Sequence, residues 1–152
     1  MSDICLRPAT ESDLELLYAI HREAMKGYIE QTWGAWDESW QARRFREQFD
    51  TTVRRVIRWG DHDVGFIDVE PRHDGLWLAS IEIAPAYQRR GIGTFLLRGL
   101  IGESARCGGA VGLQVLKVNP ARVLYERLGF RLTGETETHY LMKHSSTGAQ
   151  PN

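Results

Sequence analysis

The residues best suited to bind an anion lie where a short apolar segment turns into a helix. Residues 88–93 read Gln-Arg-Arg-Gly-Ile-Gly, and the apolar segment before them ends at Pro85. Glycines let a ligand approach the backbone, and the first turn of a helix presents unpaired N–H groups with a partial positive charge. Arg89 and Arg90 add charges suited to phosphate. The pattern predicts a pyrophosphate-binding loop, and the alternative is a strand–helix turn that merely needs glycines.

Two common phosphate-binding fingerprints do not fit this loop. A dinucleotide fingerprint needs a third glycine where Leu96 stands, and the Gly-Lys-Ser/Thr of a Walker A loop does not occur in the chain. The pattern Gln-x-x-Gly-x-Gly after a strand instead resembles the acetyl-CoA loop of the GNAT acetyltransferase superfamily. That resemblance implies acetyl-CoA as the cofactor, with its diphosphate on the backbone N–H groups of residues 89–94. The loop residues assigned to the cofactor are Gln88, Arg89, Arg90, Gly91, Ile92, Gly93 and Thr94.

A second segment, residues 119–130, supports the same resemblance. It reads Asn-Pro-Ala-Arg-Val-Leu-Tyr-Glu-Arg-Leu-Gly-Phe, in which Asn119 can cap a helix that ends at Gly129. This pattern resembles the second conserved GNAT segment, and the match covers residues 76–131 well and 3–25 more loosely. The resemblance implies that Tyr125 protonates the leaving thiolate and that Asn119 and Arg122 help to bind the cofactor, with Asn119 also aiding the acceptor. Simple packing of Tyr125 and pure N-capping by Asn119 are the alternatives.

Glu82 is the candidate general base. It lies between Ile81 and Ile83 in an apolar strand, where a carboxylate is uncommon unless it is paired or has a function. Burial there is expected to raise its pKa and make it a better base. The alternatives are that Glu82 faces solvent or that an ordered water serves as the base, as in some GNAT members. The backbone groups of Ile81 and Ile83 are expected to bind the pantetheine arm in the manner of an added strand.

Several aromatic and acidic residues are candidates for the acceptor site. Trp33 and Trp36, with Glu38, form one group that could surround an amine, and His139 and Tyr140 form another. The alternative for the tryptophans is that they pack two N-terminal helices onto the sheet. His21, on the first of these helices, is expected to be a partly buried surface residue.

The elements around these residues follow from periodicity and turn signals. We expect strands at residues 3–8, 52–59, 64–69, 76–84 and 111–116, and a closing pair over 130–143 that turns at Gly134 and Glu135. Helices are expected from residue 11, from Asp37 to about Phe49, after the glycine loop with Phe95 facing the sheet, and after Asn119. Together they predict an α/β GNAT fold, with a mixed, mostly antiparallel sheet flanked by helices on both faces. One domain is expected over residues 3–144, followed by a disordered tail at 145–152.

The composition of the chain argues against some classes of binding partner. The chain has 152 residues and a net charge of −1, which gives no electrostatic case for nucleic acid or an anionic membrane. The two cysteines suit free thiols in the cytoplasm, and no metal site is expected. We therefore expect an acetyl-CoA-dependent N-acetyltransferase that acts on a primary amine by direct transfer in a ternary complex. A small amine is the favoured acceptor. The alternatives are a protein or peptide acceptor and a non-catalytic acyl-CoA-binding regulatory module, and a homodimer, common in the family, is left open.

Overall fold

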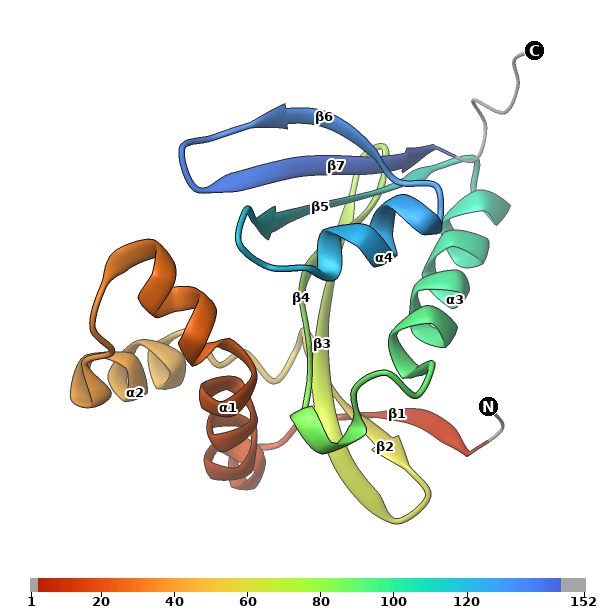
Figure 1. The fold of residues 1–152 in the computed structure, drawn as a ribbon. Helices are drawn as coiled ribbons and strands as arrows, with labels where there is room; N and C mark the ends of the chain where they lie inside the picture. Colours follow the sequence, from red (N-terminus) through yellow and green to blue (C-terminus); the bar gives the residue numbers. More distant parts are fainter. Residues whose placement is uncertain (1–2, 146–152) are drawn as a thin grey trace. The chain divides into compact units, whose positions relative to one another are not determined.

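The computed structural model describes residues 3–145, which form one seven-stranded mixed sheet and four α-helices. The strand order is β1-β2-β3-β4-β5-β7-β6 (Figure 1). β4 and β5 pair in parallel, whereas the pairs β1–β2, β2–β3, β5–β7 and β6–β7 are antiparallel. The elements are β1 (Ile4–Pro8), α1 (Leu14–Trp33), α2 (Glu38–Glu47), β2 (Arg54–Trp59), β3 (His62–Arg72), β4 (Gly75–Ile83), α3 (Ile92–Arg106), β5 (Ala110–Leu116), α4 (Ala121–Arg127), β6 (Arg131–Glu135) and β7 (His139–Ser145), with short 3-10 helices at Glu11–Asp13 and Pro85–Tyr87.

The described chain divides into two compact units, and each is built from two stretches of sequence. The N-terminal unit consists of residues 3–68 and 80–92, and the C-terminal unit consists of residues 69–79 and 93–145. Both β3 and β4 contribute residues to each unit.

The core of the N-terminal unit joins α1 and α2 to the sheet. Leu17 and Ile20 of α1 are buried with Phe45 of α2, Val56 of β2 and Phe66 of β3. Val56 and Phe66 are partners in the β2–β3 register, so their side chains share one face of the sheet. Full burial of side chains of this size contributes about 1.5–3 kcal/mol each, and this core therefore fixes the two helices on the strands.

A buried ion pair lies beside this core. Arg54 donates from Nε to Asp68 Oδ1 at 2.9 Å and from Nη2 to Asp68 Oδ2 at 2.7 Å. Its guanidinium lies 4.0 Å from the centre of the Phe66 ring and 4.9 Å from that of Phe45. The bidentate geometry and the aromatic faces offset part of the cost of removing both charges from water, and Arg54 Nη1 is buried without a hydrogen-bond partner among the described residues.

Close backbone packing positions the strand that carries the candidate base. A Cβ on Gly65 of β3 would lie 2.2 Å from the carbonyl oxygen of Glu82 in β4. No side chain can be accommodated at that distance, so glycine at this position lets the two backbones approach. The amide of Ala84 then donates to the carbonyl of Val64 at 2.8 Å, which fixes the end of β4 against β3.

The core of the C-terminal unit forms around the parallel strands. The β4–β5 register runs from Gly75↔Ala110 to Leu78↔Leu113, so Ile81 and Ile83 lie outside it. Ser104 near the end of α3 donates to the carbonyl of Ala110 at 2.8 Å, which connects that helix to β5. The strand–helix–strand unit predicted over residues 76–117 is therefore present.

Three expectations about packing and turns were wrong. Phe95 is 42% exposed, and Leu97 is buried on α3 in its place. The last hairpin turns at residues 136–138 rather than at Gly134 and Glu135, because those two residues pair with Leu141 and Tyr140 and therefore belong to β6. Ser145 belongs to β7, and the rest of the predicted tail, residues 146–152, lies outside the described residues.

Candidate functional site

Two residues of the glycine loop have a left-handed backbone conformation. Arg89 has φ +63° and Gly91 has φ +85°, both in the left-handed region. A non-glycine residue rarely adopts this region, so the loop holds Arg89 in an uncommon conformation. The side chain of Gln88 donates from Nε2 to the carbonyl of Ile83 at 2.8 Å and connects the loop to the end of β4.

This loop has the donors that a diphosphate needs. Within residues 3–145, the backbone N–H groups of Arg89, Arg90 and Gly91 have no backbone acceptor. The first N–H groups of α3, which starts at Ile92, also lack intrahelical acceptors. The Ile92 side chain is buried, so only its backbone is available. The loop therefore fits an anion such as the diphosphate of coenzyme A.

The basic side chain of Arg90 is held close to the loop by aromatic rings. Its guanidinium lies 5.6 Å from the centre of the Trp59 ring and 5.7 Å from that of Tyr87. Stacking of this kind limits the freedom of a long side chain while leaving its donors available. Trp59 and Tyr87 were not predicted as site residues, because only tertiary contacts associate their rings with Arg90.

Glu82 does not face solvent. Its side chain is 13% exposed, and its Oε1 lies 2.7 Å from Nδ1 of His21, whose side chain is 17% exposed. The alternative of a solvent-facing Glu82 is therefore wrong. This pairing has no signal in the sequence, because His21 on α1 and Glu82 on β4 are 61 residues apart.

Glu38 closes a hydrogen-bond network between α1 and α2. Tyr18 donates to its Oε2 at 2.5 Å, and Arg22 Nε and Trp36 Nε1 donate to its Oε1 at 2.8 Å and 3.0 Å. These donors, Tyr18 first, lower the pKa of Glu38. Burial, followed by the bond to Glu38, raises the pKa of Tyr18 to about 12. Glu38 thus connects the two helices through its carboxylate.

The three neighbouring tryptophans have different environments. Trp33 is 60% exposed and Trp40 is 47% exposed, so the expectation that the tryptophans pack the helices onto the sheet is wrong for these two. The ring of Trp36 lies 6.0 Å from that of His21. Asp37 caps α2 as predicted, accepting from the amide of Trp40 at 3.1 Å. Trp36 is therefore the tryptophan associated with the His21–Glu82 pair.

The C-terminal unit holds the other predicted residues. Asn119 Oδ1 accepts from the amide of Ala121 at 2.9 Å, so Asn119 supports the start of α4 as its capping interpretation requires. Tyr125 is buried, with its ring 5.8 Å from that of Phe130. These contacts give both residues a structural role. The same residues can also act in catalysis.

Tyr140 and His139 lie at the start of β7. Arg122 and Lys117 lie 4.6 Å and 5.4 Å from the centre of the Tyr140 ring, so this tyrosine is associated with two cations. His139 Nδ1 lies 2.8 Å from Thr138 Oγ1, and burial lowers the pKa of His139.

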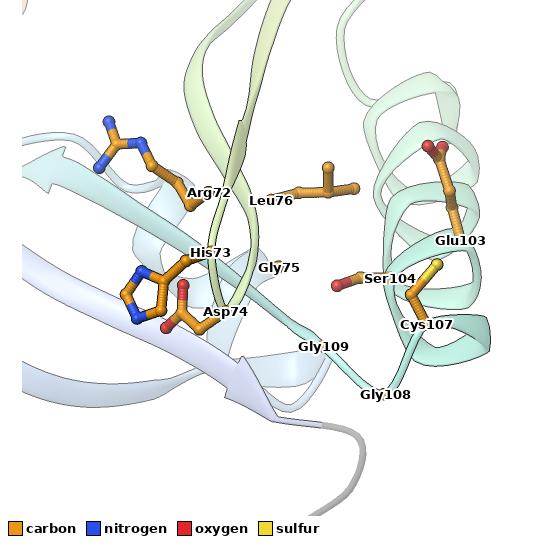
Figure 2. Close-up of a pocket in the computed structure, with 10 residues that line it drawn as sticks. All are labelled: Arg72, His73, Asp74, Gly75, Leu76, Glu103, Ser104, Cys107, Gly108 and Gly109. Carbon is orange, nitrogen blue, oxygen red and sulfur yellow. The ribbon is translucent and has the colours of Figure 1, made fainter.

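A hollow of about 310 Å³ in the C-terminal unit contains none of the predicted site residues. It is lined by the turn between β3 and β4 and by the end of α3, including Ser104 and Cys107 (Figure 2). Because α3 has 15 residues, its two ends are about 22 Å apart, and the glycine loop is at the other end. This hollow is therefore distinct from the predicted cofactor loop.

Residues 3–145 hold no group of three or more metal-ligating side chains, and no helix in this range is long and apolar enough to cross a membrane.

Comparison with known families identifies the class of protein. The family model described as "Acetyltransferase (GNAT) domain" matches residues 52–132, which is more than half of the chain. The chain therefore belongs to the GNAT acetyltransferase family. A search of curated proteins found no match.

Solved structures share this fold at low sequence identity. A PaiA N-acetyltransferase from Thermoplasma acidophilum, in complex with coenzyme A, is 19% identical with a TM-score of 0.74, over 93% of this chain and 98% of that one. An acetyltransferase from Thermus thermophilus is 19% identical with a TM-score of 0.72, over 93% and 96%. The ribosomal-protein-S18-alanine N-acetyltransferase from Escherichia coli is 23% identical with a TM-score of 0.67, over 98% and 97%. These similarities confirm the predicted fold.

Proposed function

We propose that this protein is an N-acetyltransferase that uses acetyl-CoA and transfers the acetyl group directly to a primary amine in a ternary complex. The observation that carries the proposal is the glycine loop within the family-matched segment, with unpaired N–H groups at residues 89–91. The coenzyme A complex of the Thermoplasma acidophilum structure supports the choice of cofactor. Two exposed free cysteines favour a cytoplasmic location.

The loop would hold the diphosphate, and the end of β4 would hold the pantetheine arm. Ile81 and Ile83 lie outside the β4–β5 register, which supports their backbone groups as partners for an extended ligand. Arg90, Asn119 and Arg122 are the further side chains that we assign to the cofactor.

Acetyl-CoA, when bound, supplies an acyl group activated as a thioester. Glu82 is assigned as the base that removes a proton from the acceptor. Its carboxylate is held in place by a hydrogen bond to His21. Tyr125 is assigned as the acid that provides a proton to the leaving sulfur, because it lies on α4 within the segment that resembles the second conserved GNAT segment.

For the acceptor we propose a small amine. The acceptor-binding residues that we assign are Trp33, Trp36 and Glu38 in the N-terminal unit and His139 and Tyr140 in the C-terminal unit. A peptide is a second candidate, because the exposure of Trp33 and Trp40 suits an extended ligand and the Escherichia coli structure is named as an enzyme that acts on a protein alanine.

The test is a transfer assay with acetyl-CoA and a panel of acceptors, read by mass spectrometry. The panel contains a linear diamine, free lysine and a hexapeptide that begins with alanine. Acetylation of the diamine or lysine supports the small-amine proposal, and acetylation of the peptide alone supports the second candidate. Acetyl-CoA binding without transfer to any acceptor would instead favour a non-catalytic binding module.

A further inference from the structure

The contact between His21 and Glu82 has the geometry of an imidazole held by a carboxylate. Nδ1 of His21 lies 2.7 Å from Oε1 of Glu82, and both side chains are largely covered. An ionised carboxylate can only accept a hydrogen bond, so an ionised Glu82 requires the proton of the His21 ring on Nδ1. In the neutral ring this leaves the lone pair on Nε2.

The Nε2 atom is available as a base. Among the described residues, no hydrogen bond to His21 other than the one at Nδ1 is present. A neutral imidazole nitrogen is a better proton acceptor near neutral pH than an ordinary carboxylate, because the effective catalytic base titrates near the working pH.

Aromatic rings fix the plane of this imidazole. The His21 ring stacks on Phe45 of α2 at 5.1 Å and 26°, and it lies 6.0 Å from Trp36 and 6.4 Å from Tyr18. Phe45 belongs to the buried core of the unit, so the platform under His21 is rigid.

The charged and titratable groups around His21 come from three elements. Glu82 of β4 is the direct partner. Glu38 of α2 is hydrogen-bonded by Tyr18 and Arg22 of α1 and by Trp36, so its charge is already matched by an arginine and two neutral donors. Glu82 is therefore the carboxylate available to stabilise a positive charge on His21.

We propose that His21 Nε2 is the atom that accepts the proton of the acetyl acceptor, and that Glu82 acts by holding His21 and stabilising its protonated form. This inference rests on the proposed acetyltransferase function. It changes the role of Glu82 from proton acceptor to positioning residue.

The proposed transfer forms one carbon–nitrogen bond and breaks one carbon–sulfur bond. The nitrogen of the acceptor forms a bond to the acyl carbon, and its N–H proton moves to Nε2. The carbon–sulfur bond breaks with its electron pair on sulfur, which takes the proton of the Tyr125 phenol. Water then removes the proton from His21 and returns one to Tyr125.

Two substitutions separate proton acceptance from hydrogen bonding. His21→Asn keeps a side-chain N–H donor close to the position of Nδ1 but has no titrating nitrogen. We expect it to bind acetyl-CoA with unchanged affinity, to lose at least about 100-fold in kcat, and to lose the fall of the rate at acidic pH. His62→Asn, at an exposed histidine in the same unit, is the matched control and should retain the wild-type rate.

A measurement on the protein alone tests the geometry. Nitrogen-15 NMR of the imidazole rings, with His21 assigned by its absence in His21→Asn, should show a proton on Nδ1 in the neutral form. In Glu82→Gln, the preference for a proton on Nδ1 should weaken, because a side-chain amide can donate to the ring as well as accept from it.

The results of these experiments distinguish failure of the His21 assignment from failure of the proposed function. A proton on Nε2 of the neutral ring, or full activity in His21→Asn, would overturn the assignment of His21 while leaving the acetyltransferase function intact. A wild-type protein that neither binds acetyl-CoA nor acetylates any of the diamine, lysine and alanine hexapeptide would remove the proposed function and this inference with it. Loss of transfer in His21→Asn with normal acetyl-CoA binding supports the inference.

Discussion

The two units of the chain place their candidate chemical groups in contrasting surroundings. In the N-terminal unit, Glu82 and His21 form a hydrogen-bonded pair beside the network centred on Glu38. In the C-terminal unit, Tyr125 is buried against the ring of Phe130. The proposed function assigns proton acceptance to the N-terminal unit and proton donation to the C-terminal unit.

The largest expected effect concerns the stability of the N-terminal unit. Asp68→Leu would leave the buried guanidinium of Arg54 without its partner, and breaking a buried pair in this way costs about 3–5 kcal/mol. Urea unfolding should show a strongly lowered midpoint. Asp74→Leu is the control in the C-terminal unit, because the Asp74–Lys143 pair is exposed and its loss should change little. Equal losses in the two variants would contradict the difference between the pairs.

The second prediction concerns the loop that leads from one unit to the other. Gly91→Val places a β-branched residue at φ +85°, which should distort the loop and weaken acetyl-CoA binding by at least about 100-fold. Gly27→Val is the matched control, since a Cβ there meets nothing within 4 Å and the residue lies on α1. Retained affinity in Gly91→Val would refute the loop as the diphosphate site.

The third prediction tests the role of the C-terminal unit. Tyr125→Phe removes the phenol proton and keeps the ring against Phe130, so kcat should fall about 100-fold with little change in acetyl-CoA affinity. Tyr28→Phe, on α1, is the control for the loss of a tyrosine hydroxyl at a position with no assigned role. A parallel fall in affinity and kcat in Tyr125→Phe would indicate that this residue acts by packing.

The smallest expected effects are on stability against acid. The bond from Arg7 lowers the pKa of Asp13 from 3.8 to about 2. Because the folded pKa is depressed, this stabilisation of about 2 kcal/mol is present above pH 4 and is lost as the pH falls towards 2. Asp13→Asn should remove that part of the pH dependence of unfolding. A variant with an unchanged acid profile would contradict this account.

The C-terminal unit has its acid sensitivity in a different pH range. Burial lowers the pKa of His139, so the unfolded chain binds a proton more readily than the folded chain below about pH 6.5. Stability should therefore decline as the pH falls through that range, and His139→Gln should reduce the decline. An identical pH dependence in the variant would show that His139 does not contribute.

Local sequence patterns predicted most of the elements and the start of α2. Alternation, turn residues and capping signals are local, so Asp37 at the start of α2 and the glycine loop before α3 could be located from short stretches of chain. The closing hairpin was placed wrongly, because a bulge near Gly134 is set by pairing with β7 and has no local signal.

The candidate site was predictable where it follows a motif and not where it depends on tertiary contacts. Asn119 and Tyr125 lie within one recognisable segment. The His21–Glu82 pair joins α1 to β4, and neither residue indicates the other in the sequence. The burial of Leu97 in place of Phe95 likewise depends on how α3 is rotated against its neighbours, which helical periodicity alone leaves open.

Calorimetric titration of the wild-type protein with acetyl-CoA, beside NAD and ATP, tests the central claim most directly. We predict saturable binding of acetyl-CoA with one site per chain and no comparable binding of the two other nucleotides. Absence of acetyl-CoA binding, or equal binding of all three ligands, would contradict the assignment of the glycine loop and the function proposed from it.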